Sequence, residues 1–196
     1  EGDDLFPEGP NGTEFSDYDY IDTWKAMEEL HRKGLAKSIG ISNFNKRQVE
    51  RLLENCTIVP VTNQVECHPY LNQKKLIEFC TSRGIIITAY SPLGSKNSPW
   101  AKPGDVWLLD DPRLKPIAEK LRKTPAQIVL RYQIQRGLIT IPKSINKNRM
   151  AENMQIFDFE LSSDDMAHIN SFNCNKRLCP FVEFKDHKYY PFNDEY

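Results

Sequence analysis

The sequence predicts an α/β fold with parallel strands, arranged as about four strand–helix units of a (β/α)8 TIM barrel. Four short apolar segments alternate with helical patterns, and this alternation is typical of a parallel sheet. The segment 85–90 is almost continuously apolar, as expected for a strand covered on both faces. The alternative is an open doubly wound sheet. That fold usually carries a G-x-G-x-x-G pattern after its first strand, and none occurs here.

The 196 residues are interpreted as one domain, with a loop over 1–19, strand–helix units over 20–173 and a tail over 174–196. Four units are about half of a barrel, and a complete one typically needs about 250 residues. Half a barrel leaves two strand edges unpaired, which favours aggregation. We therefore expect the N-terminal half of the barrel in a segment preceding Glu1, in preference to the pairing of two copies.

The elements can be justified in chain order. Residues 1–19 are rich in Gly, Pro, Asp and Asn, which predicts a long loop. The first helix then presents one apolar face and ends before Gly34. That face consists of Tyr20, Trp24, Met27 and Leu30. Strands are expected at 37–42, 61–65, 85–90 and 138–141. Further helices are expected from Asn45, from Asn72 to Gly84, over 112–121, from Thr124 to Gly137, and over 147–156 and 163–172.

Capping patterns support several of these helix starts. Asn45 is followed three residues later by Gln48, which predicts a capping box. Thr124 and Gln127 repeat that spacing, with Pro125 at the first helical position. Asn72 is a third candidate N-cap, for a helix expected to bury Leu76, Phe79 and Cys80. A polar excursion over 95–111 interrupts the pattern and is expected to lie over the barrel mouth.

Composition excludes several classes of function. The formal net charge is −1, so no basic surplus exists to neutralise nucleic-acid phosphates. No apolar run approaches the roughly 20 residues of a membrane span. The five cysteines lack C-x-x-C spacing, which disfavours a disulfide framework or a metal site. We therefore expect a cytoplasmic protein with reduced cysteines and no metal.

Polar residues follow the predicted strands, where a β/α barrel places its active site. They are Ser42 and Asn43, Gln64 and Glu66, Tyr90 and Ser91, and Lys143 and Ser144. The last pair leads into a helix with Arg149 on its first turn, so two cations and a helix N-terminus predict a phosphate site. The alternatives are that polar residues simply terminate strands, and that the cations form a solvated helix face.

Four motifs resemble the aldo-keto reductases, in particular their aldose and aldehyde reductase branch. They are Gly40-Ile41-Ser42-Asn43-Phe44, Asn63-Gln64-Val65-Glu66-Cys67-His68-Pro69-Tyr70, Tyr90-Ser91-Pro92-Leu93-Gly94 and Ile141-Pro142-Lys143-Ser144. The similarity extends over the whole chain. It implies NADPH-dependent reduction of aldehyde and ketone carbonyls to alcohols by hydride transfer, in a full-length protein that is a monomer.

The resemblance implies a role for each matching position. Ser42, Asn43 and Gln64 would hold the nicotinamide carboxamide, and Tyr90 would stack on the nicotinamide ring. Ser91, Leu93 and Ser95 would line the pyrophosphate. Lys143, Ser144, Ile145 and Arg149 would surround the 2′-phosphate, and Glu152 and Asn153 the adenine. Two cations at that phosphate would favour NADPH over NADH.

The tail is expected to form part of the substrate pocket, with Cys179 and Phe181 suited to an apolar or aromatic carbonyl. Ordinary packing is the alternative for both. No residue of this chain matches the family's catalytic tyrosine, lysine, aspartate and histidine, which we expect upstream of Glu1. His68 is interpreted as structural. The alternatives to an enzyme are a non-catalytic NADPH-binding subunit and a structural protein or truncated product.

One departure from the family pattern gives a prediction. Lys96-Asn97 stands where close relatives often carry an aspartate that helps a loop clamp over the pyrophosphate. Asparagine should weaken this clamp, so Asn97→Asp should slow NADPH release. Stopped-flow measurement of NADPH dissociation from the full-length protein tests this, and an unchanged release rate would contradict it.

Overall fold

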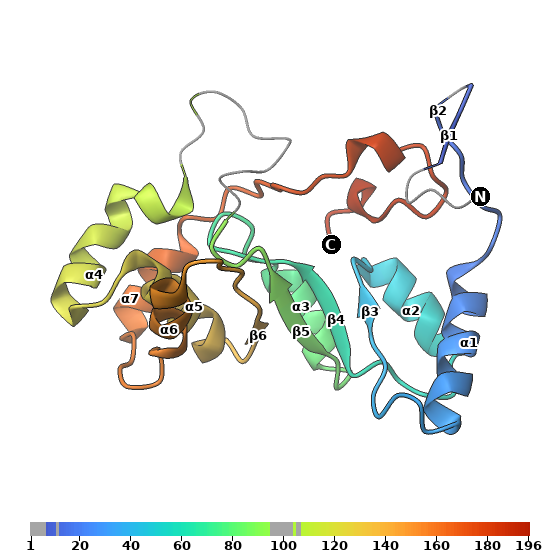
Figure 1. Ribbon diagram of the computed structural model, residues 1–196, viewed down its shortest axis with the longest axis horizontal. Coiled ribbons are helices and arrows are strands. Elements are labelled where there is room, and N and C mark those ends of the chain that lie inside the picture. The colour runs from blue at the N-terminus through green and yellow to red at the C-terminus, as the bar shows by residue number, and fades with distance from the viewer. Residues whose placement is uncertain (1–6, 11, 95–103, 105–106) are drawn as a thin grey trace.

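The computed structural model describes residues 7–10, 12–94, 104 and 107–196 and has an α/β fold (Figure 1). Its main sheet has four parallel strands in the order β3-β4-β5-β6. These strands span Ile41–Ser42, Thr62–Glu66, Ile86–Tyr90 and Ile139–Thr140. Each strand pairs with the next one along the chain, as in a β/α barrel. The predicted fold class, a partial barrel, is thereby confirmed.

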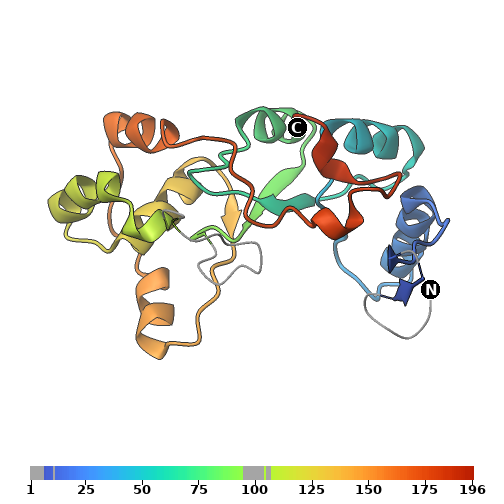
Figure 2. The same cartoon turned by 90° about the horizontal axis from the view of Figure 1, so that it is seen from above.

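Helices connect the strands and extend beyond them. The α-helices are α1 (Tyr20–Arg32), α2 (Lys46–Asn55), α3 (Lys74–Thr81), α4 (Lys115–Leu121), α5 (Pro125–Gln135), α6 (Lys147–Met154) and α7 (Ser163–Asn170). The 3-10 helices are η1 (Leu108–Asp110), η2 (Pro112–Leu114), η3 (Val182–Phe184) and η4 (Pro191–Asn193). Helices α2 and α3 lie on one side of the strands, and α6 projects on the other (Figure 2). None of the described helices is both long enough and apolar enough to span a membrane.

The two faces of the sheet differ in burial. Side chains such as Val65, Ile87 and Ala89 point to the face covered by α2 and α3 and are almost fully buried. Alternate residues point to the opposite face, where Ile86 and Ile139 remain 47% and 46% exposed. Successive strand side chains alternate between faces, so the polar residues in register with these positions share the open face.

A second apolar core packs between α4, α5 and α7. It centres on Ile128, Tyr132 and Ile169, which have no exposed surface. Tyr70, from the loop after β4, joins this cluster, and its hydroxyl donates to Asp111 over 2.8 Å. This loop therefore connects the sheet to the helices at the far end of the chain.

The capping predictions are confirmed for α2 and α5. Asn45 and Gln48 form a reciprocal capping box, and so do Thr124 and Gln127. The predicted cap of α3 was wrong by one residue. Its N-cap is Gln73, whose φ of 54° is left-handed, although the Asn72 side chain still accepts a hydrogen bond from the Lys74 backbone.

Several predicted boundaries differ from the structure. The 1–19 loop contains a short hairpin, β1 (Glu8–Gly9) with β2 (Gly12–Thr13), in which Gly12 takes a φ of 103°. The strands predicted at 37–42 and 138–141 are reduced to two residues each. Both are outer strands of the described sheet, so each has a backbone partner on one side only. Their ladders are correspondingly short.

The buried face of α1 also differs from the prediction. It consists of Ile21, Trp24 and Glu28, whereas Leu30 is 41% exposed. Glu28 is buried because the loop after α2 surrounds its carboxylate with donors. These are the backbone N–H groups of Thr57 and Ile58 at 2.7 and 2.8 Å, and the indole of Trp24, on α1 itself, adds a further donor at 3.1 Å. Apolar periodicity could not show this, because a charged residue is expected on the outside.

The Glu28 carboxylate should contribute pH-dependent stability. Burial alone would raise its pKa, but the hydrogen bonds from Ile58, Thr57 and Arg32 outweigh burial and lower its pKa from 4.5 to about 2. A lowered folded-state pKa stabilises the protein above the unfolded pKa, and this stabilisation is lost as the pH falls towards 2. Glu28→Gln should therefore reduce the unfolding free energy by roughly 2 kcal/mol at pH 7.

Urea denaturation at pH 7 and at pH 3 measures this contribution. The difference between wild type and Glu28→Gln should narrow at the lower pH. Glu29→Gln is the matched control, because the Glu29 side chain is 58% exposed and should change stability by less than about 0.5 kcal/mol. A Glu28→Gln effect that stays constant from pH 7 to pH 3 would contradict the assignment.

Candidate functional site

The carboxyl ends of β3, β4 and β5 bring together five of the predicted cofactor residues, namely Ser42, Asn43, Gln64, Tyr90 and Ser91. Parallel register sets Ser42 beside Gln64, and Glu66 beside Tyr90. The Ser42 hydroxyl and the Asn43 backbone N–H both donate to the Gln64 carbonyl oxygen over 2.9 Å. Asn43 and Ser91 have positive φ values of 58° and 47°. These conformations are uncommon for residues other than glycine and turn the chain sharply where each strand ends.

Asn43 Oδ1 and the Tyr90 hydroxyl, at the ends of β3 and β5, are buried and make no hydrogen bond of normal geometry among the described residues. Thr140 Oγ1, at the end of β6, is a third such atom. Burial also raises the pKa of the Tyr90 hydroxyl, which makes it a poor proton donor at neutral pH. Buried polar groups are usually paired, so unpaired ones indicate a missing polar partner at this end of the sheet.

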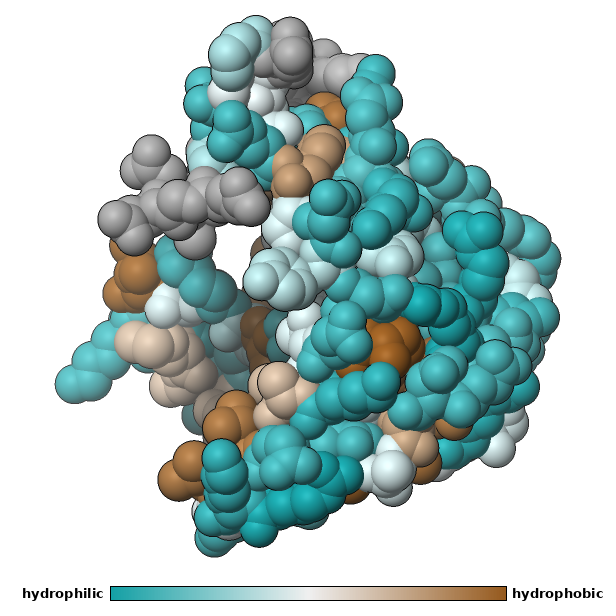
Figure 3. All heavy atoms as spheres, turned by 90° about the vertical axis from the view of Figure 1, so that its right-hand side faces the viewer, coloured by the Kyte–Doolittle hydropathy of each residue, from teal (hydrophilic) through white to brown (hydrophobic). Residues whose placement is uncertain are grey.

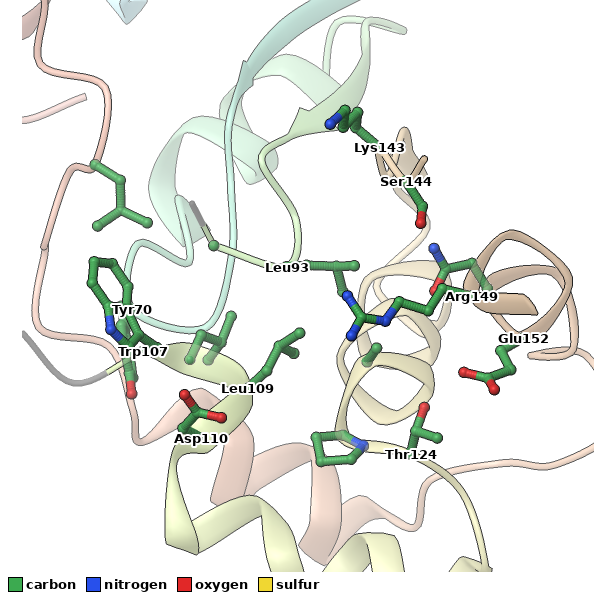
Figure 4. A pocket seen from close by; sticks show the side chains of 16 residues that line it. Tyr70, Leu93, Trp107, Leu109, Asp110, Thr124, Lys143, Ser144, Arg149 and Glu152 are labelled. Carbon is green, nitrogen blue, oxygen red and sulfur yellow. The ribbon is translucent and has the colours of Figure 1, made fainter. Parts of the chain in front are cut away.

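A groove of about 520 Å³ continues from Leu93, just beyond β5, to α6 (Figure 4). It unites six predicted cofactor residues, namely Leu93, Lys143, Ser144, Arg149, Glu152 and Asn153. Arg149 reaches from α6 towards Leu93, while Trp107 and Leu109 line the opposite wall. The groove therefore has an apolar wall and a rim that carries the cations.

The two cations of this groove lack carboxylate partners within the described chain. Lys143 and Arg149 are both exposed, and neither takes part in an ion pair there. The N-terminus of α6 is less open than the sequence suggested, because the Asn146 side chain accepts from the backbone N–H groups of Asn148 and Arg149. The attraction for an anion therefore depends mainly on the two side-chain charges.

Not every predicted residue lies in the groove. Ile145 is 87% exposed and does not line it, and Ser95 and Asn97 lie outside the described residues. The sequence analysis also missed part of the lining, including Tyr70, Trp107 and Thr124. Thr124 was recognised only as a helix cap, because sequence spacing does not reveal that the start of α5 faces α6.

The tail covers the strand ends, passing above the sheet from α7 towards the N-terminal hairpin (Figure 1). Cys179 Sγ lies 4.0 Å from Ser91 Oγ, beside the predicted cofactor residues. Phe181 contributes to a separate pocket of about 350 Å³ that also includes Asn43. Its other lining residues are Phe15, Phe184, His187, Tyr189, Tyr190, Pro191 and Phe192. Figure 3 shows mostly polar side chains on the α1 side of the molecule, with brown apolar residues bordering a hollow.

Glu66 and His68 form a buried pair at the end of β4. Both side chains have no exposed surface, and His68 Nε2 lies 2.8 Å from Glu66 Oε1. Glu66 also accepts backbone hydrogen bonds from Leu178 and Cys179 of the tail. The sequence marked Glu66 as a polar strand-end residue but gave no sign of these tail contacts. In the described part of the chain, no cluster of His, Cys, Asp and Glu could hold a metal ion.

Comparison with known proteins gives the family. Residues 12–173 match the model of the aldo/keto reductase family. The chain belongs to the aldo/keto reductase family. It is 50% identical over 205 residues to aldo-keto reductase family 1 member A1 of Gallus gallus and 48% identical to member A1-A of Danio rerio. It is also 48% identical over 199 residues to estradiol 17 beta-dehydrogenase 5 of Mus musculus.

All of this chain aligns with these relatives, but it spans only 62–63% of their length. The aldo/keto reductase fold is a (β/α)8 barrel, and the four parallel strands described here form part of one. The resemblance inferred from the four motifs is thereby confirmed.

One of those motifs has a steric requirement in this aldo/keto reductase. A Cβ atom on Gly40 would lie 2.7 Å from the Thr62 Cγ2 methyl and 2.9 Å from the Thr62 carbonyl oxygen. Gly40→Ala should push β3 away from β4 and lower the unfolding free energy by roughly 1–3 kcal/mol, the usual cost of overpacking. Denaturant unfolding measures this effect.

Thr62→Ala tests the origin of the clash. Adding it to Gly40→Ala should recover only part of the loss, because the Thr62 carbonyl oxygen stays in place. Full recovery would mean that the side-chain contact alone excludes alanine. A neutral Gly40→Ala would show that the two strands separate at no cost.

Proposed function

We propose that the protein containing this chain reduces aldehyde or ketone carbonyls to alcohols with NADPH. The observation that carries the proposal is the single groove in which Lys143, Ser144 and Arg149 face Leu93. Membership of the aldo/keto reductase family supports it. When bound, NADPH supplies the hydride. The proposal includes a monomer that acts in the cytoplasm on a small carbonyl substrate, independently of nucleic acid and membranes.

The strand-end residues suit the nicotinamide. Asn43 Oδ1 is a buried acceptor without a partner among the described residues, and Gln64 offers an amide beside it. A carboxamide carries both donors and acceptors, so it could satisfy such groups together. The Tyr90 ring lies on the same face of the sheet and would cover one side of the nicotinamide. Ser91 and Leu93 then continue towards the groove.

The far end of the groove suits the 2′-phosphate of NADPH. Lys143 and Arg149 supply two positive charges, and the Ser144 hydroxyl adds a donor. Charge-assisted hydrogen bonds to a phosphate are about twice as strong as neutral ones. Glu152 and Asn153 lie one turn further along α6, where adenine would be held. NADH lacks this phosphate, so the two cations would favour NADPH.

The aromatic pocket suits an apolar substrate. Phe181, Phe184 and Phe192 line it, and Asn43 connects it with the nicotinamide end of the site. Aromatic side chains bury large apolar areas and pack well against rings. The name of the mouse relative refers to estradiol, which has fused rings. An aromatic or alicyclic ketone is therefore the substrate class we expect, with Cys179 at the side nearest Ser91.

Substitution of the two cations tests the cofactor assignment. Lys143→Met and Arg149→Met should each weaken NADPH binding roughly tenfold to a hundredfold, the loss expected for a charged hydrogen bond. The affinity for NADH should change less than about threefold. Fluorescence titration of the full-length protein measures both. Lys147→Met is the matched control, because Lys147 is on the same helix but does not line the groove. Equal losses for both cofactors would reject a 2′-phosphate site.

A turnover assay tests the reaction itself. NADPH oxidation is followed with a panel of aromatic, aliphatic and sugar aldehydes and ketones, and a thermal melt with NADPH reports binding independently. Turnover with at least one carbonyl supports the reductase. A raised melting temperature without any turnover would support a non-catalytic NADPH-binding subunit instead. The absence of both turnover and a raised melting temperature would reject both functions.

A further inference from the structure

The Glu66 carboxylate is completely enclosed at the mouth of the sheet. It is the last residue of β4 and lies in register with Tyr90, yet its side chain has no exposed surface. Burying a charge is costly unless every lone pair finds a donor. The donors around Glu66 therefore explain why a carboxylate is present here.

Three donors satisfy this carboxylate, and two of them belong to the tail. The Leu178 backbone N–H donates to Oε1 over 2.6 Å, and the Cys179 backbone N–H donates to Oε2 over 2.9 Å. His68 Nε2 completes the set at 2.8 Å from Oε1. Because a carboxylate only accepts, the proton of this contact is on His68 Nε2. Both oxygens of Glu66 already accept hydrogen bonds from the protein and its side chain has no exposed surface, so it does not reach a substrate from this position.

A second set of hydrogen bonds joins the tail to the start of α2 at residues 189–191. The Asn45 side chain donates to the Pro191 carbonyl oxygen over 3.0 Å, and the Gln48 side chain donates to the Tyr189 carbonyl oxygen over 2.8 Å. Residues 180–188 therefore lie between two hydrogen-bonded anchors, which are Glu66 at one end and the start of α2 at the other. This segment contributes Phe181 and Phe184 to the aromatic pocket.

The positive charge of Arg177 adds an electrostatic attraction to the hydrogen bonds between Glu66 and the tail. The Arg177 guanidinium stacks 3.8 Å from the Phe192 ring centroid, and its Nη1 atom is buried with no hydrogen-bond partner in the described part of the chain. Burial lowers the pKa of Arg177, whereas the negative charge of Glu66 acts in the opposite direction. Neutralising Glu66 would remove this favourable charge from the half-buried Arg177. The tail would then lose two hydrogen bonds and an electrostatic attraction at the same point.

We infer that Glu66 is a positioning residue for substrate selection. It fixes the path of residues 178–179, and thereby sets where Cys179 lies beside Ser91 and where Phe181 enters the aromatic pocket. The inference rests on the proposed function, because the tail is taken to line the carbonyl-binding pocket. Cofactor affinity should depend on Glu66 less than substrate affinity does, because Leu178 is the one anchored residue that lines the α6 groove, and the cations there would bind the phosphate end.

Two variants of Glu66 and one control separate this role from general stability. Glu66→Gln keeps the shape of the side chain but turns one acceptor into a donor that faces an N–H group. Glu66→Asp keeps the charge but withdraws the carboxylate by one methylene. Glu183→Gln removes an exposed carboxylate from the same tail and is the matched control.

Amide hydrogen exchange tests the anchor without any activity. In the wild type, the Leu178 and Cys179 amides should be strongly protected. Exchange as fast as that of an exposed amide would overturn the inference even if neither Glu66 variant folds. In Glu66→Gln and Glu66→Asp, exchange of the Leu178 and Cys179 amides should accelerate roughly tenfold to a hundredfold, as for the loss of a hydrogen bond to a charged group. Glu183→Gln should leave it unchanged.

Steady-state kinetics in the full-length protein then test selection. Both Glu66 variants should raise the KM for aromatic ketones about tenfold, while the NADPH dissociation constant stays within about twofold and kcat falls less than KM rises. Faster exchange with unchanged KM would overturn the role in selection. Equal losses of substrate and NADPH binding would indicate general damage and also overturn it. If the wild type neither binds NADPH nor reduces carbonyls, the proposed function fails while the exchange result still decides the anchor.

Discussion

Parallel pairing of β4 with β5 is the constraint on which the rest of this structure depends. Five residue pairs, from Thr62 with Ile86 to Glu66 with Tyr90, align the two strands in the same direction. Parallel alignment places both carboxyl ends at one edge, and β3 and β6 extend the same arrangement. Polar residues from well-separated parts of the chain therefore meet at that edge. A shift of one residue would turn every side chain to the opposite face and disperse them.

The site uses electrostatics differently at its two ends. At the α6 groove, Lys143 and Arg149 are exposed, so salt and water screen them and they suit a soluble phosphate ligand. At the strand ends, charges are buried and must be compensated within the protein. Glu66 achieves this through backbone N–H groups of the tail and the ring of His68. Stability of the fold and geometry of the pocket are therefore linked at Glu66, because the same contacts serve both.

Local sequence signals predicted the elements well where the physics is local. The capping boxes at Asn45 and Thr124 depend on residues three apart, and both formed as expected. Strand–helix alternation gave the parallel sheet. Predictions failed where distant contacts decided the outcome. The buried face of α1 includes Glu28 because donors from residues 57 and 58 surround it, and the cap of α3 moved to Gln73. The sequence predicted six residues that line one groove, but it did not predict the lining supplied by Tyr70, Trp107 and Thr124.

The sequence by itself determined the α/β fold class, the family and the residue types at the strand ends. Periodicity, caps and contiguous motifs depend only on residues that are close together along the chain. Only the tertiary structure decided which residues share a cavity and where the tail lies. Leu93 and Arg149 are 56 positions apart along the chain but line one groove. Glu66 and Cys179 are separated by 113 positions but share a hydrogen bond. Such contacts depend on how strands and helices pack in three dimensions, and the spacing of two residues along the chain does not indicate how close they lie in space.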